Sequence, residues 1–519
     1  PSRRLVIIKI VMKVRYSKFV FFIILLIGYF FVHLYQPTKL PVFADESIYI
    51  RWAQLIIDDW RQYLFFPLND GKTPLFVWSL VPFLLLVKDQ LLAGRLLSIL
   101  IGAAQGCVAF LLSKKIKIST SIAAVAGLIS TLTPYWYFHH HLALMDGLLT
   151  FWFSCSLLIV IRLITDINQA SSWKKLLPDA VCLGLSLGLA ILTKIPAFLF
   201  LPTIAVAAFG LFPLDKSQLT KSAFWLIIAL ALALVLFFCL KINPSFSQLF
   251  SRGSDFLFSW QDILFNEKWR DTLPSWPTYF GYFVKYLTWP ILFFSLISVF
   301  LEKRRLAFTF LLMSLTYLVP IMLMGRVVFA RYLFSACLPL TLLAVLAIEQ
   351  LVHHQSRFIK SATIVLLLWS GLLSAKFIIA FQTNPQNMQM VSSDIKQYLT
   401  EWSAGFGVKE TTELIRELAS QHEVFVISEG YFGTLPDGLL MYFHRTNVDN
   451  IYIEPIGQPI VSLNRSFQPS ILNAKQILLV ANSNRVQLDL ASSPKLLEVC
   501  RPFQGACHQV FDVTALIRQ

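Results

Sequence analysis

The sequence predicts an α-helical polytopic membrane protein with a small α/β domain at its C-terminal end. Of its 519 residues, 56% are hydrophobic and only 14% are charged, and the mean hydropathy is +0.65. Apolar runs of roughly 20 residues, the length that crosses a bilayer as a helix, recur as far as residue 381. After residue 382 no run is long enough to span. We therefore expect a transmembrane domain, residues 1–382, and a domain outside the membrane, residues 383–519.

The apolar runs predict eleven spans. The first, 19–35, follows a basic segment and is long enough to cross the membrane, and no small-residue cleavage site marks it as a signal peptide. The chain does not begin with methionine, which indicates a truncated or predicted start. The other spans are expected at 91–112, 119–138, 143–164, 178–195, 197–212, 221–242, 280–300, 306–324, 332–352 and 358–381. The run 74–87 is too short to span, so we expect a re-entrant or interfacial helix there.

Lysine and arginine set the expected orientation of these spans. They gather in alternate connections, which contain Lys114, Lys174, Lys216, Arg304 and Arg357. Because cytoplasmic loops are enriched in both residues, these connections and the N-terminus are predicted to be cytoplasmic. The loops 37–73 and 243–279 and the C-terminal domain are then extracytoplasmic. Residues 385–519 contain 10 basic and 13 acidic residues, so the net charge of +15 belongs to the membrane part and does not indicate nucleic-acid binding.

Ionisable residues are concentrated directly after the first span, in the stretch 44–76. Asp45 and Glu46 are adjacent, and Lys72 stands before Pro74. Charged groups beside a membrane usually line a substrate path or a cavity, although a solvated loop would also contain them. Apolar residues recur near helical spacing over 48–63, which predicts an amphipathic interfacial helix with the acidic pair at its start. A carboxylate there would cap the helix or act as a general base.

The same stretch resembles a known family. The order Asp45-Glu46, then Tyr49, then Gly71-Lys72-Thr73-Pro74-Leu75 is similar to the first external loop of the glycosyltransferases with a GT-C fold, in the group of the dolichyl-phosphate-mannose protein mannosyltransferases and aminoarabinose transferases (family 39-like). That family has an aspartate-glutamate pair and a lysine-proline-proline-leucine stretch, and this chain has Thr73 at the first proline. The resemblance implies that the loop 37–73 is catalytic and that Asp45 and Glu46 take part in catalysis.

A second acidic position follows in PYWYFHHHLALMDGLL, where Asp146 stands at the mouth of the fourth span. An acid at this depth needs a partner or a function. The resemblance implies a function, because the family has a second acidic residue in the corresponding loop near its catalytic pocket. His139, His140 and His141 suggest a metal site, but three consecutive helical residues cannot all point at one ion, so we interpret them as interfacial. Lys194 is either a snorkelling lysine or a substrate contact.

Arg326 and Arg331 lie at a later span boundary on the predicted external side, against the general distribution of positive charge. Each needs an anion, and a guanidinium suits bidentate contact with phosphate. Arg331-Tyr332, with Pro339 downstream, also resembles the family's arginine-tyrosine stretch. This resemblance implies that Arg331 and Tyr332, together with Lys72, bind the phosphate of the donor. Pairing of Arg331 with a loop carboxylate is the alternative.

The remaining segments predict local structure more than chemistry. The loop 243–279 mixes tryptophans with charged residues, as is typical of an interfacial segment that covers the active site, holds the acceptor or only anchors the protein. The runs EVFVIS, IYIEPI and QILLVAN with the helical TTELIRELAS predict the C-terminal α/β domain, and EWSAGFGVKETTELI resembles a segment after the last span in bacterial members of the family. Cys500 and Cys507 are expected to form a disulfide.

Two classes of function follow. The first is a cell-membrane glycosyltransferase that moves a hexose or pentose from a polyprenyl-phosphate carrier to a protein, lipid or envelope-glycan acceptor at the external face. Asp45 would deprotonate the acceptor or stabilise the oxocarbenium, Asp146 would assist, and Lys72 and Arg331 would neutralise the leaving phosphate. That phosphate is already a good leaving group, so no metal or other cofactor is required, although a divalent metal is compatible. The second class is a transporter or flippase, which predicts midplane charges and an internal repeat that the sequence does not show.

Overall fold

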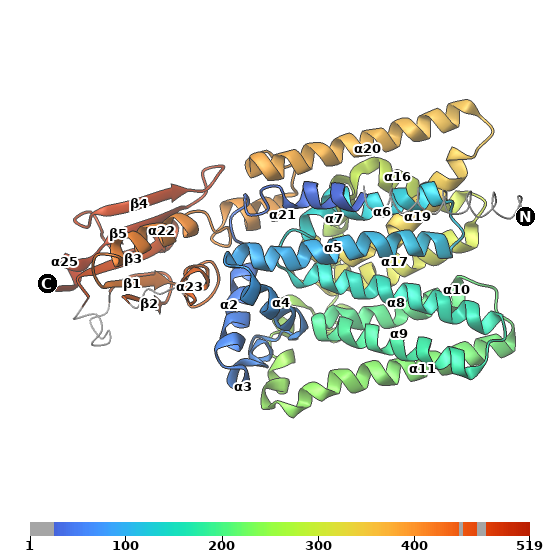
Figure 1. Cartoon of the computed structure of the whole chain (residues 1–519), viewed down its shortest axis with the longest axis horizontal. Helices are drawn as coiled ribbons and strands as arrows, with labels where there is room; N and C mark the ends of the chain where they lie inside the picture. The colour runs from blue at the N-terminus through green and yellow to red at the C-terminus, as the bar shows by residue number, and fades with distance from the viewer. Residues whose placement is uncertain (1–24, 446–449, 464–473, 519) are drawn as a thin grey trace, which may run out of the picture.

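The structure is a computed structural model that describes residues 25–445, 450–463 and 474–518. A long helical bundle and a smaller part built around a β-sheet follow one another along the longest axis of the molecule (Figure 1). The basic N-terminal segment and the beginning of the predicted span 19–35 lie outside the described residues. The rest of that span is the helix Leu25–Leu34.

Eight helices among the described residues are long and apolar enough to cross a membrane, and each coincides with a predicted span. They are Gln90–Lys115 (α5), Met145–Asn168 (α8), Trp173–Thr193 (α9), Lys216–Ile242 (α11 and η3), Trp269–Phe300 (α14 to η7), Arg304–Met324 (α17), Ala330–Val352 (α18 to α19) and Arg357–Thr383 (α20). The other three predicted spans match shorter apolar helices, namely Leu25–Leu34, Thr120–Leu132 (α6) and Ile195–Gly210 (η2 and α10).

One predicted span, 119–138, is shorter in the structure for a local reason. The helix α6 ends at Leu132, and Thr133 is extended, with φ −66° and ψ 150°. Pro134 follows, and a proline disfavours helical geometry in the residue before it. A new helix, Pro134–His139 (α7), starts at the proline. The chain therefore turns before it reaches the three histidines and the start of α8.

The segment after the first span crosses the end of the bundle that faces the sheet (Figure 1). It contains Ala44–Asp58 (α2), Trp60–Tyr63 (α3), Phe66–Asp70 (η1) and Leu75–Leu86 (α4). The predicted helix 48–63 is therefore interrupted. Asp59 is extended, and its carboxylate accepts hydrogen bonds from the amides of Arg61 and Gln62, so it ends α2 and caps α3. The short helix predicted over 74–87 is α4.

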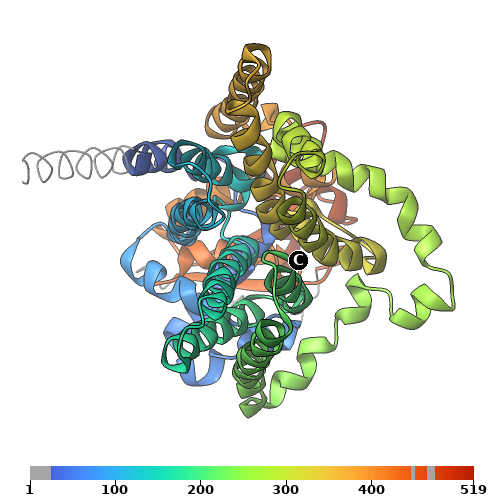
Figure 2. The ribbon, with the colours of Figure 1, turned by 90° about the vertical axis from the view of Figure 1, so that its right-hand side faces the viewer.

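The predicted loop 243–279 is a chain of short helices that swings out from the bundle (Figure 2). They are Pro244–Phe250 (η4), Gly253–Phe256 (α12), Trp260–Leu264 (α13), Trp269–Thr272 (α14), Leu273–Ser275 (η5) and Trp276–Phe283 (α15). This arm is fixed to the bundle at two places. Arg252 forms an ion pair with Asp70, and the amide of Arg326 donates to the carbonyl of Phe256.

The C-terminal part contains one five-stranded sheet with the order β2-β1-β3-β5-β4. Its strands are Val424–Glu429 (β1), Ile451–Ile456 (β2), Gln476–Asn482 (β3), Lys495–Cys500 (β4) and Cys507–Asp512 (β5), and its helices are Val408–Ala419 (α22), Asp437–Phe443 (α23) and Thr514–Arg518 (α25). The strand β1 is parallel to β2 and β3, whereas β5 is antiparallel to β3 and β4. The first three strands, α22 and the disulfide between Cys500 and Cys507 were predicted, and all are confirmed.

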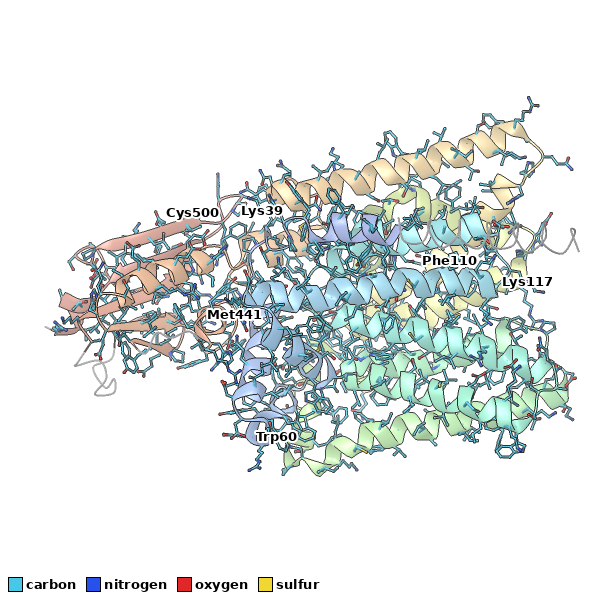
Figure 3. All side chains as sticks on the ribbon, viewed as in Figure 1. Lys39, Trp60, Phe110, Lys117, Met441 and Cys500 are labelled. Atoms are coloured by element: carbon cyan, nitrogen blue, oxygen red, sulfur yellow. A yellow bond between two sulfur atoms is a disulfide. The ribbon has the colours of Figure 1, made fainter. Side chains whose placement is uncertain are left out.

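The sheet part is attached to the start and the middle of α2. The amide of Ala44 donates to the carbonyl of Ser403 at 2.9 Å, and the amide of Gly405 donates to the carbonyl of Val42 at 2.8 Å. Further along α2, the side-chain amide of Gln54 donates to the carbonyl of Met441 at 2.8 Å, and Figure 3 shows Met441 at this junction. Lys117, in a basic connection, lies at the opposite end of the bundle (Figure 3). The N-terminus of α2 is thus held between the bundle and the sheet part.

Candidate active site

Asp45 and Arg331 form an ion pair at the start of α2. The Nη1 atom of Arg331 donates to Oδ2 of Asp45 at 2.7 Å, although the two residues are 286 positions apart. Arg331 lies in Ala330–Leu333 (α18), at the beginning of a membrane-length helix. Its guanidinium also lies over the rings of Phe43, at 5.2 Å, and of Tyr332, at 5.4 Å. In this structure Arg331 therefore pairs with a loop carboxylate, which was the alternative to phosphate binding.

The charges around Asp45 keep it ionised. Burial opposes ionisation of this carboxyl, but the positive charges of Arg331, Lys72 and Lys194 outweigh burial and lower its pKa below the ordinary value. The side chain remains 22% exposed. Asp45 is thus an accessible carboxylate whose basicity is reduced as long as Arg331 holds it.

A second ion pair joins Asp146 to Lys194. Asp146 is in the first turn of α8, and its Oδ1 accepts from Nζ of Lys194 at 2.6 Å. Lys194 is extended between α9 and η2, and its ammonium lies 4.8 Å from the ring centre of Tyr332. Because Tyr332 is the neighbour of Arg331 in the chain, the two ion pairs lie close together. The partner that Asp146 was expected to need is therefore Lys194.

Lys72 belongs to the same region. The turn that presents it passes through Gly71 in the left-handed conformation, with φ 70°, which glycine adopts without strain. The ammonium of Lys72 is 3.0 Å from Oδ2 of Asp70 and lies over the rings of Tyr49 and Trp52, at 5.2 and 5.3 Å. Its charge contributes to the lowered pKa of Asp45. Lys72 and Arg331 therefore both act on Asp45, and both could contact one bound anion.

Glu46 differs from its neighbour Asp45 because it is fully buried. Its two oxygens accept from Nε and Nη2 of Arg95, at 2.9 and 2.7 Å. They also accept from the amides of Phe43, at 3.0 Å, and Ala143, at 2.8 Å. Glu46 is therefore the acid that caps α2 and ties it to α5 and to the connection before α8. This environment favours a structural role over the catalytic role that the sequence predicted.

The three histidines are buried and do not act as interfacial anchors. Both ring nitrogens of His141 lie near backbone carbonyls, those of Tyr137 at 2.8 Å and His33 at 3.0 Å. The ring of His139 packs 4.9 Å from that of Phe334. Over the described residues, the group whose ligand atoms lie close enough to share an ion is Glu498, Cys500 and Cys507, and these cysteines are bonded to each other. The histidines form no such group.

Several residues of this region were not singled out in the sequence. Arg95 donates to the carbonyls of Pro37, Leu40 and Pro41 as well as to Glu46. In the sequence, an arginine inside an apolar run was the signal for it. Asp394 is buried and accepts from Oη of Tyr286 at 2.8 Å. Burial raises the pKa of Asp394 to about 6. In the sequence, Asp394 lies among polar residues, as a surface residue would, so no signal marked it.

Comparisons with known proteins bear on the family and the fold. The family model for dolichyl-phosphate-mannose-protein mannosyltransferase matches residues 70–245. No curated protein sequence matches the chain. ArnT from Cupriavidus metallidurans in the apo state is similar over 97% of this chain and 99% of its own, with 15% identity and a TM-score of 0.55. Its structure with undecaprenyl phosphate is similar over 96% and 99%, with the same identity and TM-score. The apo oligosaccharyltransferase of Archaeoglobus fulgidus is similar over 89% and 69%, with 10% identity and a TM-score of 0.52.

These matches confirm two predictions. The resemblance to this family is confirmed by the family match, which begins at residue 70 and includes Lys72, Asp146 and Lys194 but not the Asp45-Glu46 pair. The predicted fold class, a polytopic GT-C membrane fold with a small C-terminal α/β part, is confirmed by the solved structures, whose low identity makes them evidence for the fold alone. Asp45 and Arg331 lie outside the matched range, so their roles depend on the geometry described above.

Proposed function

We propose that this multi-pass membrane protein is a glycosyltransferase that uses a polyprenyl-phosphate-linked sugar as donor. The acceptor is a protein, a lipid or an envelope glycan. One observation supports the proposal most strongly: two carboxylates, Asp45 and Asp146, and three cations, Lys72, Lys194 and Arg331, lie together. The helix α2, which contains Asp45, lies at the end of the apolar bundle that faces the folded α/β part (Figure 1). Such a site can hold an anionic lipid headgroup while the lipid remains in the membrane. The family match and the ArnT structure with undecaprenyl phosphate agree with it.

The cations are assigned to the donor phosphate. The phosphodiester of the donor has one negative charge and two free oxygens that a guanidinium can contact together, so it can compete with Asp45 for Arg331 and with Asp70 for Lys72. Tyr332 lies against both Arg331 and Lys194 and orients them. Neutralisation of the phosphate lowers the barrier to breaking its bond to the sugar, because the negative charge on the leaving oxygen grows in the transition state.

Donor binding would also activate Asp45. In the free protein the pairing with Arg331 lowers the pKa of this carboxyl. When Arg331 turns to the phosphate, the pairing weakens and a second negative charge approaches, and both effects raise the pKa of Asp45. Asp45 then accepts the proton of the acceptor hydroxyl or stabilises the oxocarbenium, with Asp146 assisting. The base therefore gains strength only when the donor is present.

Membrane orientation and cofactor use complete the proposal. The N-terminus is cytoplasmic and the α/β part is extracytoplasmic, as the basic connections predict. No metal or other cofactor takes part in the steps above. Glu46 is assigned to positioning, because its buried contacts with Arg95 fix the first turn of α2, which contains Asp45.

The test is a defined transfer assay with the full chain in nanodiscs. Undecaprenyl-phosphate sugars with different hexoses and pentoses are supplied, and free undecaprenyl phosphate is measured. Mass spectrometry of envelope protein, lipid and glycan from cells with and without the gene identifies the acceptor. We expect release from at least one donor and a sugar-sized mass difference in one acceptor class. Movement of the intact lipid-linked sugar across the bilayer without release of the phosphate would instead indicate a flippase.

A further inference from the structure

The sheet of the C-terminal part has a feature common in ligand-binding α/β proteins. The chain passes from β1 to β2 on one side of β1 and then to β3 on its other side. Open α/β sheets bind ligands at the carboxyl ends of their strands where the strand order reverses in this way. That edge is held together here by Glu429, at the end of β1, which accepts from the amide of Asn482, at 2.7 Å, and from Nη1 of Arg485, at 3.2 Å.

Two aromatic side chains project at this edge. Tyr431 and Phe432 follow β1 directly, and they are 70% and 59% exposed. They lie between Gly430, with φ 71°, and Gly433, with φ 107°, so the loop uses two left-handed positions to present them. A Cβ atom added to Gly457 would lie 3.2 Å from the Oη atom of Tyr431, so the ring of Tyr431 extends over the end of β2. Neighbouring exposed aromatic residues of this kind mark a binding surface.

The base of this loop is polar and rigid. The ring of Trp402 approaches Gly433 so closely that a Cβ atom there would lie 2.7 Å from it. The guanidinium of Arg485 covers Trp402 at 4.6 Å, and Oγ1 of Thr434 donates to the carbonyl of Trp402 at 2.6 Å. The loop that presents the two exposed rings is therefore packed on Trp402, with the guanidinium of Arg485 beside it.

The aromatic loop is tied to the N-terminus of α2. The Oγ atom of Ser47 donates to the carbonyl of Gly433 at 2.8 Å. The amide of Ala44 donates to Ser403, the residue after Trp402. Asp45 lies between these two attachment points in the chain. The exposed rings are thus on the part of the sheet edge that adjoins the candidate active site.

We propose that Tyr431 and Phe432 are a binding platform for a sugar ring of a carbohydrate acceptor. This inference depends on the proposed function and specifies its acceptor class. One face of a sugar ring presents C–H groups that pack on an aromatic face, and its hydroxyls bond to polar groups close by, such as Arg485 and the loop carbonyls. A membrane anchor would need the surroundings of the rings to be apolar, and here the partly exposed guanidinium of Arg485 lies at the base of the loop.

The experiment measures glycan binding directly. Full-length protein in nanodiscs is applied to a printed array of envelope-type oligosaccharides, and bound glycans are then titrated in solution. The double variant with Tyr431→Ser and Phe432→Ser is compared with wild type and with Phe503→Ser. Phe503 is 63% exposed in the turn between β4 and β5, so it controls for loss of a surface aromatic. We expect the double variant to bind roughly tenfold or more weakly, as for loss of central aromatic residues in other interfaces, and Phe503→Ser to bind normally.

A second assay separates this inference from the proposed function. It measures donor hydrolysis, the release of undecaprenyl phosphate from the donor when no acceptor is present. Asp45, Lys72 and Arg331 are unaltered in the double variant, so donor hydrolysis should equal that of wild type. Absence of glycan binding by wild type, or equal binding by the double variant, overturns the platform even if donor hydrolysis continues. Donor turnover that is absent in wild type, with intact glycan binding, contradicts only the proposed function.

Discussion

Replacement of Glu46 by glutamine tests the division of labour between the two adjacent acids. The two oxygens of Glu46 accept four hydrogen bonds, two of them from Arg95, and both side chains of this ion pair are fully buried. An amide has one acceptor oxygen, so Glu46→Gln leaves the guanidinium of Arg95 buried without a counter-charge. Loss of one partner of a buried pair costs about 3–5 kcal/mol. We therefore expect a clearly lower free energy of unfolding.

The assay is chemical and thermal unfolding of the full chain in nanodiscs, together with donor turnover per folded molecule. Glu410→Gln, at an exposed position of α22, is the matched control and should behave as wild type. The double variant with Glu46→Gln and Arg95→Met removes the buried charge as well and should be less unstable than the sum of the single changes. A stable Glu46→Gln protein that loses turnover by about 100-fold, the size of a lost general base, would refute this reasoning and make Glu46 catalytic.

Three further predictions concern the donor, the topology and pH. Lys72→Ala and Arg331→Ala should each weaken binding of undecaprenyl phosphate, since each removes a charge-assisted contact worth roughly 1.5–3 kcal/mol. The control Lys268→Ala, on the arm, should bind with normal affinity. Normal affinity in Lys72→Ala and in Arg331→Ala would exclude the phosphate site. A cysteine at Ser420 should react with an impermeant maleimide in intact cells and one at Ser217 should not, and the reverse result would invert the topology. The pKa of Asp394 is raised to about 6 by burial, so its contribution to stability is full below its ordinary pKa and disappears as pH rises through 6. Between pH 4 and pH 7, wild type should therefore lose up to about 3 kcal/mol of stability relative to Asp394→Asn, and parallel stability profiles would contradict this.

Hydropathy and local signals predicted much of the fold. Apolar length alone located all the membrane-length helices, because each span must satisfy its own backbone hydrogen bonds. Local patterns also located α4, the first three strands and the disulfide. The strands β4 and β5, KLLEVC and CHQVFD, were missed. The break at Asp59 was missed because its capping hydrogen bonds compete with a helical pattern that continues past it.

The pairing of charges could not be predicted. Asp45 pairs with Arg331, Asp146 with Lys194 and Glu46 with Arg95, and the partners are 286, 48 and 49 residues apart. Periodicity describes neighbours within an element and contains no information on which distant charges meet when helices pack. The sequence therefore identified Asp45 and Glu46 as one acidic pair. In the structure, Asp45 pairs with the partly exposed Arg331, whereas Glu46 pairs with the fully buried Arg95. Charged residues inside apolar spans, such as Arg95, are the available signal for such partners.

The central claim is that Asp45 is the catalytic carboxylate, and Asp45→Asn tests it most directly. Asparagine keeps an oxygen near Arg331 and the shape of the side chain but cannot accept the acceptor proton. We predict a folded, membrane-inserted variant with normal thermal stability, binding of undecaprenyl phosphate at least as tight as that of wild type, and glycosyl transfer lowered by about 100-fold or more. Asp271→Asn, at an exposed position of the arm, should transfer at the wild-type rate. Transfer by Asp45→Asn at near the wild-type rate would contradict the account and leave Asp146 as the candidate base.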